Sequence, residues 1–455
     1  MSERRGNEAL AALLAEARWS AAELARAVNT LGTAQGLRLR YDRSSVAHWL
    51  AGSRPRRPVP DLAAAALTRR TGRLITPHST GLAQTTHAPP LVTHIPARRE
   101  HLVQQLLDLW RQDADPHQRV FLTRTSYSLA ALDLSPWAAA PQSAQLKATD
   151  APDVAARLQT HHEMTHTFAG LAERHGSRTI RPLLAAYLAD SAAPTLMQPA
   201  PGETGQRDLF TATAQLTHLL AGMADDSGHH GLAQRYYLSA LHLTRAVDDA
   251  RQYAITLRAM SAHALRLRLP QQALHLAETA VAVLGSGDDG AAQAFLLTQR
   301  AHANASTGRA QEARADLHAA ERHHERASST PGPFDAYPRA ALDYQRYQTL
   351  IALRDDSQAL TALEVSAHHR PVAERRATAL TQARLAETHL AQGRLDEALP
   401  HARSFLSAYP HLHSAHVDTA HQHLDYALAQ YPGQPQAIAL REQVRNLIRL
   451  APPST

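Results

Sequence analysis

The chain has 455 residues, with 47 Lys+Arg against 41 Asp+Glu and no cysteine. This length predicts two or more domains, and the lack of cysteine excludes a disulfide framework and a thiolate metal site. No stretch reaches the roughly 18 to 20 apolar residues of a membrane helix, and the N-terminus lacks the apolar core of a signal peptide. A cytoplasmic protein without a membrane partner is expected.

Positive charge is concentrated at the N-terminus. Residues 1–75 contain 13 arginines and 6 acidic residues, a local excess of +7, so the whole-chain value of +6 leaves −1 for the remaining 380 residues. A basic module on a near-neutral body is typical of proteins that bind a polyanion. The alternative is a solvated surface face.

Four helices are predicted in this module, because apolar residues recur at helical spacing in 7–17, 20–29, 42–51 and 60–71. Ser20 and Glu23 form a Ser-x-x-Glu capping box at the start of the second. Asp42 is placed to cap the third helix and Gly52 to end it.

The second and third segments predict a helix-turn-helix, with 42–51 as the helix that enters the major groove. Leu24, Ala25 and Val28 would brace Val46 and Leu50. Trp49 lies between two apolar positions and is interpreted as core. The connection, residues 30–41, is about a dozen residues long, where this motif expects 3 or 4.

The predicted DNA contacts fall into two classes, because phosphate contacts position a protein and base contacts specify the sequence. The expected base-edge contacts are Arg43, Ser44, Ser45 and His48. The expected phosphate contacts are Arg38, Arg40, Arg54, Arg56 and Arg57.

Residues 76–152 are predicted to be a linker and a helical middle segment. Prolines, threonines and histidines crowd 76–96, a helix is expected over 98–110, and a second apolar run covers 120–134. Residues 135–152 are rich in proline and alanine and predict a loop.

His162, Glu163 and His166 then match the HExxH pattern, in which two histidines of one helix face share a zinc ion. Against a metallopeptidase, Ala169 and Ala172 occupy the positions where an extended motif has glycine and a third histidine. With 29 histidines in the chain, a chance match is of the order of one in ten. The segment also carries an ordinary packing stripe, so the metallopeptidase remains a remote alternative.

Residues 153–450 are predicted to be helical throughout, with an internal repeat near 40 residues. Glycine followed by alanines at fixed offsets marks three copies, namely Gly228 with Ala233, Gly308 with Ala313 and Gly393 with Ala398, and further copies fall at Ala273 and, more loosely, at Ala359. Small residues at fixed positions let two helices pack closely and each pair stack on the next. The pattern is similar to the tetratricopeptide repeat. The segment Gly285–Gly290 fits GxGxxG, but no strand precedes it, and we interpret it as a turn between helices.

Three strings carry a more specific resemblance. Residues 36–55, which include Ser45-Val46 and Trp49-x-x-Gly52-x-x-Pro55, resemble the N-terminus of actinobacterial regulators with a phage-repressor-type (XRE-like) helix-turn-helix. The strings at 231–237 and 259–261 resemble the repeat region of the same group. The resemblance implies transcriptional control, often of development or specialised metabolism, with a repeat domain that dimerises or binds a signal.

The sequence therefore predicts an all-α protein: a helix-turn-helix domain (1–75), a middle segment (76–152) and a tetratricopeptide-like α-solenoid (153–450). The expected function is that of a nucleoid-associated transcriptional regulator that binds double-stranded DNA as a homodimer, with a possible peptide or protein ligand in its repeat groove. No enzymatic activity, cofactor or metal ligand is expected. The main alternative is a repeat scaffold without specific DNA binding.

Overall fold

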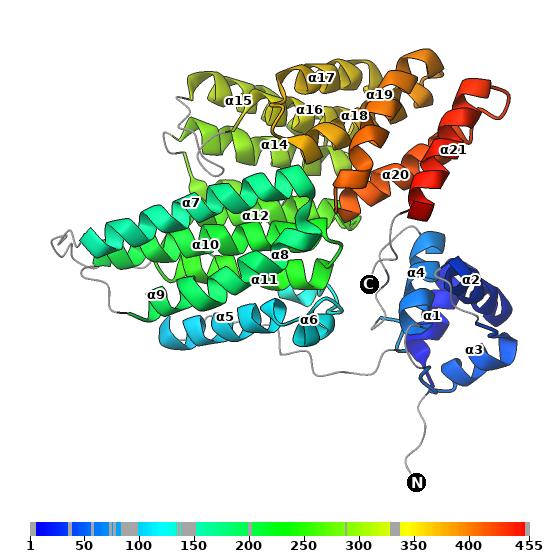
Figure 1. The fold of residues 1–455 in the computed structure, drawn as a ribbon, viewed down its shortest axis with the longest axis horizontal. Coiled ribbons are helices and arrows are strands. Elements are labelled where there is room, and N and C mark those ends of the chain that lie inside the picture. Colours follow the sequence, from blue (N-terminus) through cyan, green and yellow to red (C-terminus); the bar gives the residue numbers. More distant parts are fainter. Residues whose placement is uncertain are drawn as a thin grey trace, which may run out of the picture. The chain divides into compact units, whose positions relative to one another are not determined.

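The structure is a computed structural model that describes residues 6–34, 39–55, 59–71, 75, 79–82, 99–132, 134, 137, 152–198, 203–286, 289–327 and 337–450. Every regular element in these ranges is a helix, which confirms the all-α prediction (Figure 1). Two compact units are present: an N-terminal unit (residues 1–90, 125–128 and 453–455) and a helical body (91–124 and 129–452). None of the described helices is both long enough and apolar enough to cross a membrane.

The N-terminal unit contains four helices at the predicted positions: α1 (Glu8–Ala17), α2 (Ala21–Ala34), α3 (Arg43–Leu50) and α4 (Val59–Thr71). The capping box at the start of α2 is confirmed, because the Ser20 backbone N–H donates to Glu23 Oε2 at 2.7 Å. The single core extends past residue 75, since Ile75 and Leu82 are buried against the four helices. The side chain of Asn7 fixes this extension by donating to the Thr80 carbonyl at 2.9 Å.

One boundary differs from the sequence prediction. The second helix was expected to end at residue 29, but α2 continues to Ala34. Because α3 begins at Arg43, at most eight residues separate the two helices, instead of a dozen. The hydroxyls of Thr30 and Thr33 donate to carbonyls one turn earlier, at 2.9 and 3.0 Å.

The helical body begins with α5 (Arg99–Ala114) and α6 (Pro116–Leu122). The apolar run predicted over 120–134 is not one element, because α6 ends at Leu122 and only a 3-10 turn, η1 (Ala130–Leu132), follows. Then come α7 (Pro152–His175), α8 (Ser177–Tyr187), the π-helical segment η2 (Leu188–Ala192) and α9 (Ala193–Met197). The buried pair Asp113–Arg181 holds α5 against α8, and the Tyr236 hydroxyl donates to Asp113 at 2.8 Å.

Five helical hairpins follow, and their turns have the same length and backbone geometry. They are α10 (Glu203–Asp226) with α11 (His230–Arg245), α12 (Ala250–Arg266) with α13 (Pro270–Leu284), α14 (Gly290–Ser306) with α15 (Ala310–Arg326), α16 (Arg339–Ala352) with α17 (Asp356–His369), and α18 (Arg375–Ala391) with α19 (Leu395–Ala408). In each turn the middle of three residues has a positive φ; the five are Gly228, Arg268, Gly308, Arg354 and Gly393. Sequence analysis found only the three glycines, because arginine fills the same backbone position in the second and fourth hairpins.

An alanine lies five residues after the middle residue of every turn, namely Ala233, Ala273, Ala313, Ala359 and Ala398, and each is at most 1% exposed. A larger side chain there would separate the two helices of the hairpin, which explains the fixed spacing of small residues. Gly285 ends α13 and Asp289 caps α14, which begins at Gly290, so at the described residues this segment lies between two helices, as predicted.

The body ends with η3 (Tyr409–His411), α20 (Ala415–Leu428) and α21 (Pro435–Leu450). The segment before α20 returns to the start of the body, where the His413 backbone N–H donates to His175 at 2.8 Å and the Arg178 N–H donates to His413 at 3.1 Å. Gly176 permits this approach with φ 81° and ψ 166°. Helices α7 and α8 are thereby joined to α20, more than 200 residues later.

Candidate nucleic-acid interface and a buried ionic network

Helix α3 is short and begins with a capping box. Asp42 accepts from the Ser45 backbone N–H at 2.9 Å, as predicted, and also from the hydroxyls of Ser44 and Ser45, each at 2.8 Å. These hydrogen bonds lower the pKa of Asp42 to about 2, so the carboxylate is ionised at neutral pH. Its charge complements the positive end of the helix dipole. Both serine hydroxyls therefore donate their hydrogen bond to Asp42.

The inner face of α3 is fixed against the core of the N-terminal unit. Val46 is 0% exposed and Trp49 is 4% exposed, and both belong to the cluster that contains Leu24, Ala25 and Val28 of α2. The Trp49 ring meets the Tyr41 ring edge-on, with 5.2 Å between centroids. This confirms the interpretation of Trp49 as a core residue.

Asn29 of α2 positions the chain that enters α3, a role that sequence analysis did not detect. Its side-chain amide donates to the Tyr41 carbonyl at 2.7 Å, and its Oδ1 accepts from the Tyr41 N–H at 2.9 Å. An asparagine within a helix gives no signal for such a long-range pairing. The consequence is that α3 is attached to α2 both by apolar contacts and by two hydrogen bonds.

The outer face of α3 presents the predicted base-contact residues. Arg43, Ser44 and His48 are exposed, and Ser45 is partly buried. Of the predicted phosphate contacts, Arg40 and Arg54 are exposed and flank the two ends of α3. Arg38, Arg56 and Arg57 lie outside the described residues.

The HExxH residues lie on the outer surface of α7. His162, Glu163 and His166 are all exposed, and Glu163 accepts from the Gln159 amide at 2.8 Å. The neighbouring His161 is buried and points inward, with Nδ1 3.2 Å from the Tyr187 hydroxyl. Among the described residues, no third ligand for a metal ion joins the exposed histidine pair.

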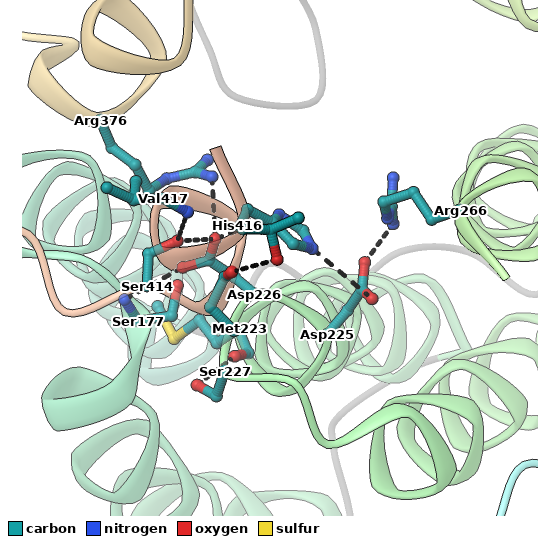
Figure 2. A network of polar contacts seen from close by, with 12 residues as sticks. Ser177, Met223, Asp225, Asp226, Ser227, Arg266, Arg376, Ser414, His416 and Val417 are labelled. Carbon is teal, nitrogen blue, oxygen red and sulfur yellow. Dashed lines mark hydrogen bonds and ion pairs between the residues drawn. The ribbon is translucent and has the colours of Figure 1, made fainter. Parts of the chain in front are cut away.

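A buried ionic network lies at the C-terminal end of α10 (Figure 2). Asp226 accepts from Arg376 of α18 at 3.1 Å, from the Ser414 hydroxyl at 2.6 Å and from the Ser177 N–H at 3.2 Å. Arg376 also donates to Glu173 of α7 at 2.5 Å. Burial alone would raise the pKa of Asp226, but Arg376 and His416 outweigh it and hold that pKa well below its ordinary value.

Asp225, one residue earlier, turns toward a different set of partners. Its Oδ2 pairs with Arg266, while Oδ1 lies 3.3 Å from His230 Nδ1 and 3.4 Å from His263 Nε2. The two histidine nitrogens are 3.2 Å apart. The atoms of these three side chains are close enough together to hold a metal ion. Sequence analysis did not detect the group, because its members come from three different helices.

Comparison with known protein families gives a match for the N-terminal part of the chain. A family model described as the SP15 N-terminal domain matches residues 10–83, which span the core of the N-terminal unit from Leu10 to Leu82. No curated protein matches the chain.

Proposed function

We propose that the chain is a transcriptional regulator whose N-terminal unit binds double-stranded DNA through α3, with α2 and α3 acting as a helix-turn-helix. The observation that carries the proposal is the two-sided character of α3: Val46 and Trp49 are buried, while Arg43 and His48 are exposed on a braced helix. A short helix held rigidly from one side, with polar side chains on the other, has the form needed to read the major groove.

The capping geometry refines the proposed roles of the two serines. Because the hydroxyl protons of Ser44 and Ser45 are donated to Asp42, each oxygen offers only acceptor lone pairs to a base. Exocyclic amino groups of adenine or cytosine are the donors that the major groove presents. Arg43 and His48 supply the remaining base contacts in this proposal, with Arg43 directed at guanine.

Phosphate contacts are assigned to the arginines beside α3, because the ionised Asp42 repels phosphate from the N-terminus of the helix itself. Arg40 and Arg54 are the exposed members of this set, and Arg38, Arg56 and Arg57 complete it. The charge excess of +7 in residues 1–75 also supports phosphate binding by this unit.

The helical body is proposed to be a tetratricopeptide-like solenoid that dimerises the regulator or binds a peptide or protein signal, in the cytoplasm at the nucleoid. The support is the series of five hairpins with one turn geometry and one alanine position. A dimer would place two α3 helices about 34 Å apart, so the operator is an inverted repeat.

Selection of genomic fragments by the purified full-length protein, followed by fluorescence anisotropy at two salt concentrations, tests the proposal. We expect a recovered inverted repeat bound about a thousandfold or more tighter than random DNA. Arg43→Ala should cost about 1–3 kcal/mol and relax the preference at one position. Arg54→Ala should weaken all sequences alike and reduce the salt slope by about 1.

Arg403→Ala is the matched control, because Arg403 is an exposed arginine on α19 of the body. It should leave both affinity and salt dependence unchanged. Recovery of no motif, with only salt-sensitive and sequence-independent binding, would contradict the proposal and favour a scaffold whose basic unit docks on an acidic protein.

A further inference from the structure

We propose that Asp225, His230, His263 and His416 form a binding site for a divalent transition-metal ion of the zinc class, which ties α20 to the hairpin α10–α11 and to α12.

The spacing of the first three ligand atoms fits such an ion. Asp225 Oδ1, His230 Nδ1 and His263 Nε2 are separated by 3.3, 3.4 and 3.2 Å. Ligands bound to zinc at about 2.0–2.1 Å in a tetrahedron lie roughly 3.3 Å from one another. The triangle therefore already has the edges of a zinc site.

We assign the fourth position to His416 of α20, whose side chain has to move toward the other three, because only Asp225, His230 and His263 have ligand atoms that all lie close to one another in this structure. Its Nδ1 is 3.2 Å from Asp226 Oδ1, so a neutral imidazole that donates its Nδ1–H to that carboxylate has its lone pair on Nε2. The Nε2 atom is buried, has no hydrogen-bond partner among the described residues, and lies 3.9 Å from Asp225 Oδ1 (Figure 2). A carboxylate that orients a histidine in this way is the usual outer-shell arrangement of histidine metal ligands.

The charge of the surroundings also favours a cation. Asp225, Asp226 and Glu173 contribute three negative charges, and Arg266 and Arg376 contribute two positive charges, a sum of −1 before the histidines are counted. One further positive charge, from a proton or a metal ion, would neutralise a network with this sum. Three neutral imidazoles and one carboxylate are donors suited to zinc.

Two of the four proposed ligand side chains are partly exposed. The side chains of Asp225 and His263 are 2% and 0% exposed, but those of His230 and His416 are 31% and 27% exposed. Three ligands belong to consecutive helices and the fourth is more than 150 residues away, so binding would reinforce the contact of α20 with the start of the hairpin series.

The test uses the full-length chain, stripped with a chelator and titrated with Zn²⁺ against a chromogenic competitor, with Co²⁺ as a spectroscopic probe. We expect one tight equivalent per chain, a tetrahedral Co²⁺ spectrum, and a rise in Tm with added Zn²⁺. His230→Ala should weaken affinity by about 100-fold or more, since loss of an outer-shell partner alone costs about 10- to 100-fold.

The matched control is His162→Ala/His166→Ala, which removes two exposed histidines of the HExxH string from α7. It should leave zinc affinity unchanged. Because His230 is partly exposed, its replacement is compatible with folding, and circular dichroism checks this; His416→Gln gives a second variant with an amide of similar reach. Equal affinity in the wild type and His230→Ala, or loss of binding only in the control, would overturn the proposal.

Discussion

Gly176→Ala should open the junction between the beginning and the end of the helical body. The glycine has φ 81° and ψ 166°, a backbone region that only glycine occupies readily. An added Cβ would lie 2.5 Å from the His413 carbonyl oxygen and 2.7 Å from the His413 nitrogen. These are backbone atoms, so the clash is not relieved by rotating a side chain.

The magnitude follows from two contributions. Backbone strain costs about 1–3 kcal/mol. Displacing the segment at residue 413 also breaks the hydrogen bonds from His413 N to His175 O and from Arg178 N to His413 O, each worth about 0.5–1.5 kcal/mol net. The structure offers a control for the first contribution: Gly285 has φ 68° and ψ −159°, and no atom of the described structure lies within 4 Å of an added Cβ.

Hydrogen exchange followed by mass spectrometry separates the two variants, since a repeat array need not unfold as a single unit. Relative to Gly285→Ala, Gly176→Ala should lose about a further 2 kcal/mol at the junction, which corresponds to roughly 30-fold faster exchange of the amides of His413 and Arg178. In Gly176→Ala, peptides from α14 and α15 should exchange as in the wild type. If the amides of His413 and Arg178 exchanged equally fast in both variants, the close approach of Gly176 to His413 would contribute nothing to stability, and the predicted clash would be refuted.

Three further outcomes follow from buried groups. Asp113→Ala should destabilise the body by about 3–5 kcal/mol in thermal unfolding, because Arg181 is left as an unpaired buried charge; Asp108→Ala, an exposed neighbour on α5, should have little effect. Burial, with a smaller contribution from the adjacent histidine, lowers the pKa of His161 from 6.5 to about 4. As the pH falls, His161 is therefore protonated in the unfolded chain before it is protonated in the folded chain. The free energy of unfolding has its full value above pH 6.5 and decreases as the pH falls toward 4. In denaturant titrations across that interval, His161→Phe should reduce the slope of the unfolding free energy against pH by about 1.4 kcal/mol per pH unit at most. Trp49→Ala should cost the N-terminal unit about 3–5 kcal/mol and lower its calorimetric transition alone; a shift in the transition of the body would contradict the division into two units.

The sequence predicted features that depend on neighbouring residues. Asp42 and Ser20 cap their helices through hydrogen bonds to residues three positions later. The repeat was visible because the positions of Ala233, Ala313 and Ala398 accept only a small side chain. Prediction was less accurate for the end of α2, where Asn29, expected to be the last helical residue, lies within the helix and binds Tyr41 through its side chain. Such a boundary depends on a partner 12 residues away.

The ionic network could not be predicted, because each of its links spans a large separation in sequence. Asp226 and Ser414 are 188 residues apart, and Asp226 and Arg376 are 150 apart. No helical period or short motif relates such positions. The HExxH string, by contrast, has the correct local spacing, yet its residues lie exposed on one helix. In this chain the spacing of histidines and carboxylates in the sequence was therefore a poor predictor of a metal site. Candidate ligands from separate helices that lie close together in space predict such a site better.

The proposed metal site and the junction at Gly176 share α20, and this leads to a last prediction. His416 is two residues after Ser414, which is bonded to Asp226, so a displaced segment at residue 413 moves the fourth ligand but leaves Asp225, His230 and His263 in place. Gly176→Ala should therefore weaken zinc affinity about tenfold, less than His230→Ala does. Because zinc would bind the closed junction more tightly than the open one, added zinc should slow exchange at the junction in the wild type. Unchanged affinity in Gly176→Ala, together with an unchanged Co²⁺ spectrum, would show that α20 provides no ligand.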